Sequence, residues 1–204
     1  MGEGEVPDTE QVTAMATIEP TRQAGIPGVP PFTVDDLLKF PDDGNRYELF
    51  NGSLLVSPAP SPVHQDVIFR LQMILHRTVP SHLKVLSTVN VRSSDKDLYI
   101  PDLVVVPRER FKSVRLMFPP EDVLLAVEVV SPSTKTRDRA TKVGAYAEAG
   151  IPTYWRVEPT EGPTLYVYEL DGECYRGPAA HKPQTMASLT RPYPISFDPA
   201  DLID

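Results

Sequence analysis

The sequence predicts an α/β fold in which helices flank a mixed central sheet. Residues 122–157 alternate strand, helix and strand, which is the pattern of a parallel crossover unit. Residues 46–58 and the pair of segments 153–159 and 164–177 instead alternate as antiparallel hairpins. The sheet should therefore contain strands of both directions, with extra N-terminal and C-terminal β-hairpins.

The first part of the chain predicts a leader, a short helix and a hairpin. Residues 1–31 end in "GIPGVPP" and are expected to form a flexible leader, which leaves 32–204 as a single domain. A helix is predicted over 33–40 with Thr33 as its cap. In the hairpin over 46–58, Asn51-Gly52 occupies the favoured type I′ turn position.

The clearest helix is predicted over 61–80, where Ser61 is the N-cap and Pro62 takes the first helical position. Its apolar stripe is expected at Val63, Val67, Leu71, Ile74, Leu75 and Thr78. Strands are predicted over 84–92, 98–106 and 123–130, with a helix from about 133 to 149 after the last of them. Near the end, "ISFDPADLI" predicts an edge strand and a terminal turn.

Composition limits the classes of function. The net charge of −8 disfavours nucleic acid, but five acidic residues and no basic residue lie within 1–20, and basic residues cluster over 107–115 and 135–139. No apolar run is long enough to span a membrane, and the start lacks the basic residues of a signal peptide. Cys174 is the only cysteine, which excludes an internal disulfide. A cytoplasmic location is expected.

Two carboxylates lie in strongly apolar segments that read as strands. Asp102 stands in "YIPDLVVVP" and Glu128 in "VLLAVEVV", and on a strand each would share its face only with apolar residues. An ionised carboxylate in such a place needs a cation or several donors. Either acid alone is explained by a local turn or an arginine partner. For the two together, a shared divalent metal is the favoured interpretation.

Three further polar residues point toward the predicted core. Lys142 shares a helix face with apolar residues, so it is either a catalytic cation or the partner of Asp138 one turn earlier. His64 faces the core side of its helix, where a structural role competes with a catalytic one. Glu48 lies among apolar neighbours in the first hairpin, where a salt bridge explains it equally well.

These residues and several longer stretches carry a family resemblance. "PD" at 101–102, the acid Glu128 and a following lysine resemble the PD-(D/E)xK nuclease superfamily. The stretches "RYELFNG", "PVHQDVIFRL", "YIPDLVVV", "LAVEVVSPSTKTRDRATKVGAYAEAGIPTYWRVEP" and "LYVYELDGECY" are similar to its Uma-type bacterial branch of restriction endonucleases, long classed as a domain of unknown function. The similarity runs from about residue 33 to 175.

The resemblance implies a restriction-endonuclease-like core and a Mg²⁺ (or Mn²⁺) site, with Asp102, Glu128 and the carbonyl of Val129 as ligands. The superfamily lysine stands two residues after the acid, where this chain has Val130, so Lys142 looks like a migrated replacement. His64 and Glu48 match positions that the branch also fills with His and Glu, whereas Ser53 departs from its usual acid.

The implied reaction is hydrolysis of phosphodiester bonds in nucleic acid, with DNA as the expected substrate and a homodimer as the expected assembly. Lys135, Arg137 and Arg139 are candidates for gripping backbone phosphates, or they form a solvated helix end. One alternative is a non-catalytic domain that binds nucleic acid or protein and retains the nuclease fold. Another is a metal-dependent hydrolase of a small phosphate ester, which would need a closed pocket.

Overall fold

The structure is a computed structural model that describes residues 28–57, 59–131, 135–160 and 162–203, with the side chains of 135–139 left out. The helices are α1 (Val34–Leu37), α2 (Pro62–Thr78), α3 (Arg108–Ser113) and α4 (Lys135–Glu148), with 3₁₀ turns η1 (Pro120–Asp122) and η2 (Pro199–Leu202). The strands are β1 (Arg46–Phe50), β2 (Ser53–Ser57), β3 (Leu83–Ser87), β4 (Asn90–Arg92), β5 (Leu98–Tyr99), β6 (Leu103–Pro107), β7 (Met117–Phe118), β8 (Leu125–Val129), β9 (Thr153–Glu158), β10 (Thr164–Asp171), β11 (Cys174–His181), β12 (Ala187–Leu189) and β13 (Ile195–Phe197).

The central sheet is mixed, as predicted. Its six strands follow the order β11-β10-β9-β8-β6-β3. Strands β8 and β9 pair in parallel and are joined through α4, which confirms the crossover unit, while the other pairs in this sheet are antiparallel. The segments 153–159 and 164–177 form the predicted antiparallel pair, as β9 with β10 and β10 with β11.

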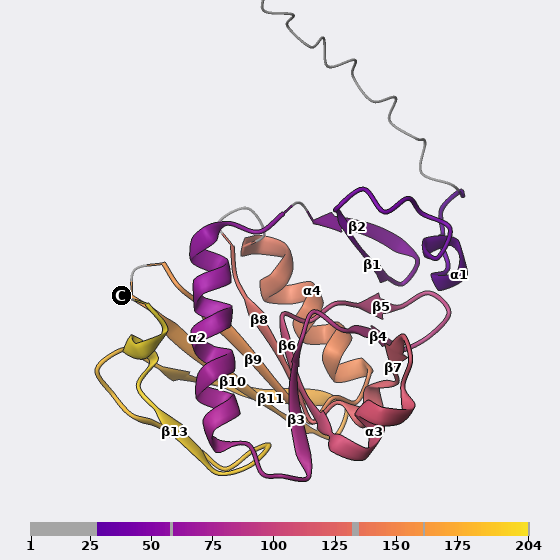
Figure 1. The fold of residues 1–204 in the computed structure, drawn as a ribbon. Coiled ribbons are helices and arrows are strands. Elements are labelled where there is room, and N and C mark those ends of the chain that lie inside the picture. The colour runs from indigo at the N-terminus through magenta and orange to yellow at the C-terminus, as the bar shows by residue number, and fades with distance from the viewer. Residues whose placement is uncertain (1–27, 58, 132–134, 161, 204) are drawn as a thin grey trace, which may run out of the picture.

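A second sheet of five strands, in the order β2-β1-β5-β4-β7, stands beside the first (Figure 1). It overturns the prediction of single strands over 84–92 and 98–106. Each of those segments is divided between the two sheets, so that β3 and β6 belong to the six-stranded sheet and β4 and β5 to the smaller one. The first division falls at Thr88, whose φ of 51° takes the chain out of the extended conformation. The second falls at residues 100–102.

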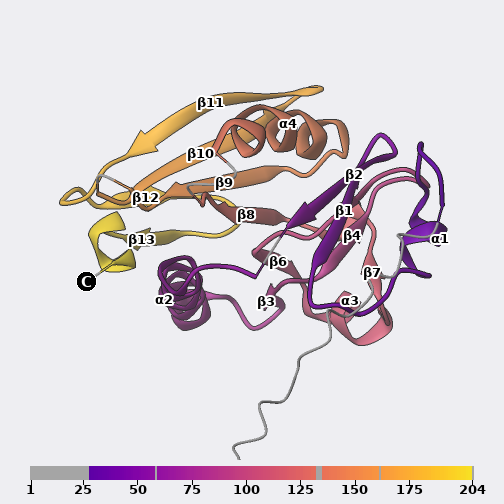
Figure 2. The same cartoon turned by 90° about the horizontal axis from the view of Figure 1, so that it is seen from above.

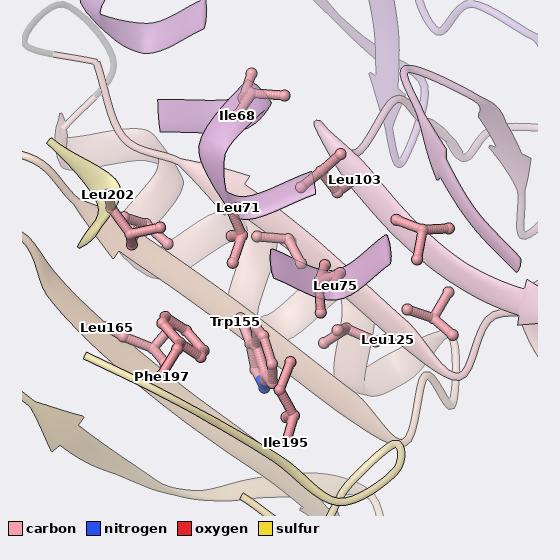
Figure 3. Packing of buried hydrophobic residues seen from close by; sticks show 14 of the residues in the cluster. Ile68, Leu71, Leu75, Leu103, Leu125, Trp155, Leu165, Ile195, Phe197 and Leu202 are labelled. Carbon is pink, nitrogen blue, oxygen red and sulfur yellow. The ribbon is translucent and has the colours of Figure 1, made fainter. Parts of the chain in front are cut away.

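The six-stranded sheet is covered on both faces (Figure 2). Helix α4 packs on one face, and α2 with the C-terminal segment packs on the other. Figure 3 shows the apolar core between α2, the sheet and that segment. Its fully buried side chains come from all three parts: Leu71, Leu75, Leu125, Trp155, Leu165 and Leu202. A sheet covered on both faces explains why β8 is buried at every position.

The caps and turns of the N-terminal elements follow from local sequence. The side chains of Thr33 and Ser61 accept hydrogen bonds from backbone N–H groups in the first turns of α1 and α2. Asn51 and Gly52 both have positive φ, as the type I′ turn requires. The predicted stripe of α2 is wrong at Thr78, which is exposed, and at Val63, which is 61% exposed. His64 takes the place of Val63 in the buried row.

The core of α2 gives a testable prediction about stability. Leu71 is fully buried against the sheet, so Leu71→Ala should lower the free energy of unfolding by about 2–5 kcal/mol. The matched control is Val63→Ala on the exposed side of the same helix, where we expect a change within about 0.5 kcal/mol. Urea unfolding followed by circular dichroism measures both. Equal losses at the two sites would contradict this packing.

Several elements were not predicted from the sequence. Helix α3 and strand β7 lie within the basic segment and just after it, and β12 pairs with β13 as a C-terminal hairpin. The predicted edge strand and terminal turn in "ISFDPADLI" are present as β13 and η2. Within the described ranges, the helices are too short or too polar to cross a membrane.

Candidate active site

Five polar side chains that the sequence singled out meet where β8 ends. Glu48 comes from β1, His64 from the first turn of α2, Glu128 from β8 and Lys142 from α4. Asp102 directly precedes β6, so the prediction that it lies within a strand is wrong by one residue. All five are buried, with exposed fractions between 3% and 8%. The carboxyl end of a strand in a crossover unit is a common place for a ligand site.

Lys142 joins two of the carboxylates. Its Nζ lies 2.8 Å from Oε1 of Glu128 and 3.4 Å from Oε2 of Glu48. The inward aim expected from helical spacing is confirmed, whereas the side chain of Asp138, the alternative partner, is outside the described residues. A buried cation between two buried acids offsets the large cost of removing each charge from water.

Tyr146 belongs to the same cluster and was not predicted. Its hydroxyl donates to Oε1 of Glu128 at 2.6 Å, and the side chain is fully buried. Its place one helical turn after Lys142 was the signal that sequence reasoning could have used. Tyr146 and Lys142 together hold one carboxylate oxygen in a fixed position.

Asp102 is held by donors from three elements. The backbone N–H of Val129 donates to its Oδ2 at 2.9 Å, and Nε2 of His64 lies 3.3 Å from the same oxygen. Nη1 of Arg46 donates to Oδ1 at 3.3 Å. Arg46 was also missed, although it alternates with Glu48 on the same strand and therefore shares its face. The bond from Val129 ties Asp102 directly to the strand that carries Glu128.

Glu48 lies deeper in its sheet than the sequence indicated. Strand β1 pairs with both β2 and β5, so it is an inner strand and not the edge of an isolated hairpin. The backbone N–H of Ile100 donates to Oε1 of Glu48 at 2.9 Å. Ile100 is two residues before Asp102, so this bond links the position of Glu48 to that of Asp102.

Burial and nearby charges shift the pKa values of the two candidate metal-binding carboxyls, Asp102 and Glu128, in opposite directions. For Asp102, burial alone would raise the pKa, but the contacts with His64, the Val129 N–H and the charge of Lys142 bring the pKa below its ordinary value. Burial raises the pKa of Glu128 to about 8, since the lowering by Lys142 is opposed by the nearby Asp102 and Glu48. Burial and the charge of Glu128 raise the pKa of Tyr146, which keeps its hydroxyl as a donor.

The donor set has the chemistry of a Mg²⁺ or Mn²⁺ site. Asp102, Glu128 and the Val129 carbonyl would offer oxygen ligands only, which hard divalent cations prefer. In the described part of the chain, no three His, Cys, Asp or Glu side chains gather closely enough to hold a metal by themselves. The proposed ligand set has only two side chains of these types, Asp102 and Glu128, because its third ligand is a backbone carbonyl. The absence of a three-side-chain cluster among the described residues is therefore compatible with this set.

The remaining candidates are only partly placed. Lys135, Arg137 and Arg139 belong to the first turns of α4, but their side chains lie outside the described residues. His64 is described, and its Nδ1 is buried without a hydrogen-bond partner among the described residues. Such a buried polar atom is uncommon in a purely structural histidine.

The fold places the protein among the restriction-endonuclease-like α/β proteins. A crystal structure titled as "a putative nuclease belonging to DUF820" from Anabaena variabilis has the same fold, with a TM-score of 0.67 and 19% sequence identity. The match covers 84% of this chain and 97% of that one. The search of curated proteins found no match.

The family is shown by the sequence itself. The Uma2 family, described as "Putative restriction endonuclease", matches residues 34–201, and the chain belongs to it. This confirms the resemblance stated from the sequence. The family and the fold support a nuclease.

Proposed function

We propose that this protein is a metal-dependent endonuclease that hydrolyses phosphodiester bonds of nucleic acid, with DNA as the expected substrate. The observation that carries the proposal is the buried cluster in which Asp102 contacts the strand of Glu128 while Lys142 contacts Glu128. Two acids of unequal pKa beside a buried cation are the pattern of an active site more often than of a purely structural core.

Each residue has a proposed role. Asp102, Glu128 and the carbonyl of Val129 would hold Mg²⁺ or Mn²⁺, which when bound lowers the pKa of a water and screens the phosphate. Lys142 orients the attacking water or stabilises the negative charge that develops on the phosphate. Glu48 positions Lys142, and Tyr146 positions Glu128. His64 positions Asp102.

Calorimetric titration with Mg²⁺ and Mn²⁺ tests the proposal. We expect the wild-type protein to bind and both Asp102→Ala and Glu128→Ala to lose binding, since each removes one of the two proposed carboxylate ligands. The matched control is Asp66→Ala, an acid on α2 whose side chain is 47% exposed and pairs with Arg70. Unchanged binding by the two site variants, or no binding by the wild type, would remove the metal site.

One observation favours a non-catalytic alternative, a domain that keeps the fold for binding nucleic acid or protein. Lys142 lies between Glu48 and Glu128, so the cluster partly neutralises itself without any metal. This alternative predicts that Asp102→Ala leaves every activity intact. Nuclease assays of that variant beside the wild type distinguish the two functions.

A homodimer is part of the proposal, because paired sites are a common means of cutting both strands of a duplex. Sedimentation velocity of the full chain tests it. A monomer at assay concentrations would remove the dimer without affecting the site.

A further inference from the structure

A small cavity opens directly beside Asp102 and is not used by the chemistry proposed above. It has a volume of about 180 Å³, and its walls include Arg46, Gln65, Phe69 and Gln72 together with the carboxylate. We infer that this cavity receives one unpaired nucleobase of the strand being cut, stacked on Phe69. The inference rests on the proposed nuclease function and narrows its substrate to single-stranded DNA or DNA with a base displaced from the helix.

Phe69 supplies the stacking surface. It is 59% exposed although it is a large aromatic residue, and it lies on α2 beside the buried row that packs on the sheet. Exposed aromatic side chains next to a basic group are the usual platforms for unpaired bases, because every base has a stacking face. Gln65 and Gln72, four residues before and three after, stand on the same side of the helix.

The two glutamines supply hydrogen-bonding groups at the edge of the stacked base. Each amide carries both donors and an acceptor, so the pair suits the mixed donors and acceptors of a base edge. Gln72 is half-buried and Gln65 is exposed, which places one amide in the wall and one at the rim. A cavity with only carboxylates or only lysines would not offer this complementarity.

A base bound in the cavity would lie near the residues proposed to act on the phosphate. The side chain of Asp102 is 5% exposed, and Asp102 is one of the residues that line the cavity. Arg46 donates to Oδ1 of Asp102 and keeps 27% of its side chain exposed. A base bound on Phe69 would therefore bring its own phosphate toward a guanidinium and a candidate metal ligand.

Thr88 also lines the cavity, and its backbone conformation is unusual. Thr88 has φ of 51°, which a β-branched residue rarely adopts, and its N–H donates to the carbonyl of Asp102 at 3.2 Å. Strain of this kind persists where the surrounding structure enforces it, and it is frequent at ligand sites. The wall of the cavity is thus fixed to the same residue that contributes the carboxylate.

The size and charge favour a single base over a duplex. Cavities for drug-sized ligands have about 300–1,000 Å³, so this one suits a smaller planar group. A base paired inside a duplex cannot enter a cavity, whereas an extruded or single-stranded base can. The net charge of −8 also weakens any binding that depends on phosphates alone, so stacking would contribute a larger share.

Fluorescence anisotropy tests the inference, using a labelled single-stranded oligodeoxynucleotide and its blunt duplex in EDTA to prevent cleavage. We expect tighter binding of the single strand. Phe69→Ala should weaken it by about five- to 150-fold without changing the salt dependence, because stacking releases no counterions. Phe69→Tyr should restore it. Met73→Ala, one turn further along α2 and outside the cavity, should bind as the wild type does.

Cleavage in Mg²⁺ separates this inference from the proposed function. If the wild type cuts DNA, and Phe69→Ala binds the single strand and cuts DNA as well as the wild type, the base site is overturned and the nuclease function remains. If the wild type binds the single strand through Phe69 but cuts no DNA in Mg²⁺, the base site stands and the nuclease fails. Equal wild-type affinity for the single strand and the duplex would also overturn the base site.

Discussion

Replacing Lys142 with Met is expected to lower the free energy of unfolding by about 3–5 kcal/mol at pH 9. The methionine fills most of the space but leaves Glu48 and Glu128, both buried, without their shared cation. Removing one partner of a buried ion cluster is more destabilising than removing the whole cluster, because the remaining charges keep their desolvation cost.

The loss should be smaller at pH 5. Lys142 lowers the pKa of Glu128, which burial already raises to about 8, so its removal raises that pKa further. A carboxyl with a raised folded pKa stabilises the protein most below its unfolded value near 4.5, and that stability declines as pH rises through the folded pKa. Below about pH 8 Glu128 is protonated in the folded state of both proteins, so their stabilities fall in parallel as the pH rises. The difference from the wild type should therefore grow only above about pH 8, where Glu128 ionises in the folded wild type but stays protonated in the variant.

Urea unfolding of both proteins at the two pH values measures this difference. The control is Lys39→Met, which removes a lysine whose side chain is 68% exposed and paired with Asp36, and which we expect to change stability by less than about 1 kcal/mol. The double variant Lys142→Met with Glu128→Gln should recover part of the loss. A loss independent of pH would mean that Lys142 contributes through packing and not through its charge.

The second large effect is expected on cleavage. Asp102→Asn should reduce DNA cleavage on the order of a thousandfold, since the amide retains the shape but not the charge that holds a divalent cation. An amide oxygen still accepts from the Val129 N–H, so the structure around β8 should persist. Gel assays in Mg²⁺ measure the rate, and circular dichroism checks the fold.

Asp66→Asn is the matched control for this substitution. Asp66 lies on α2 near the site in sequence but has a half-exposed side chain that pairs with Arg70. We expect wild-type cleavage from it. Wild-type cleavage by Asp102→Asn would exclude Asp102 from the reaction and leave the non-catalytic alternative as the better function.

Local signals were sufficient to predict much of this structure. Short-range side-chain chemistry predicts the helix caps at Thr33 and Ser61 and the turn at Asn51-Gly52. The spacing of apolar residues predicts the crossover unit around Glu128. The site candidates were found by the same means, because an acid or lysine among apolar neighbours stands out on a strand or a helix face.

What the sequence could not supply were the long-range contacts. The division of residues 84–92 between two sheets depends on which strands pair, and no periodicity in that segment indicates it. Arg46 was missed because its partner, Asp102, lies 56 residues away. The cavity at Phe69 is formed by four separate segments, so the exposed phenylalanine alone gave no signal.

The wide separation of the cluster along the chain has a consequence for synthesis. Glu48 and Lys142 are in contact although Lys142 follows Glu48 by 94 positions (142 − 48) in the sequence. Lys142 lies on α4, which follows β8 and precedes β9 in the chain. A ribosome adds about 5–20 residues per second, so several seconds pass between the emergence of the two residues. A growing chain therefore has no complete cluster until α4 has been made, and any activity of this site can begin only after that.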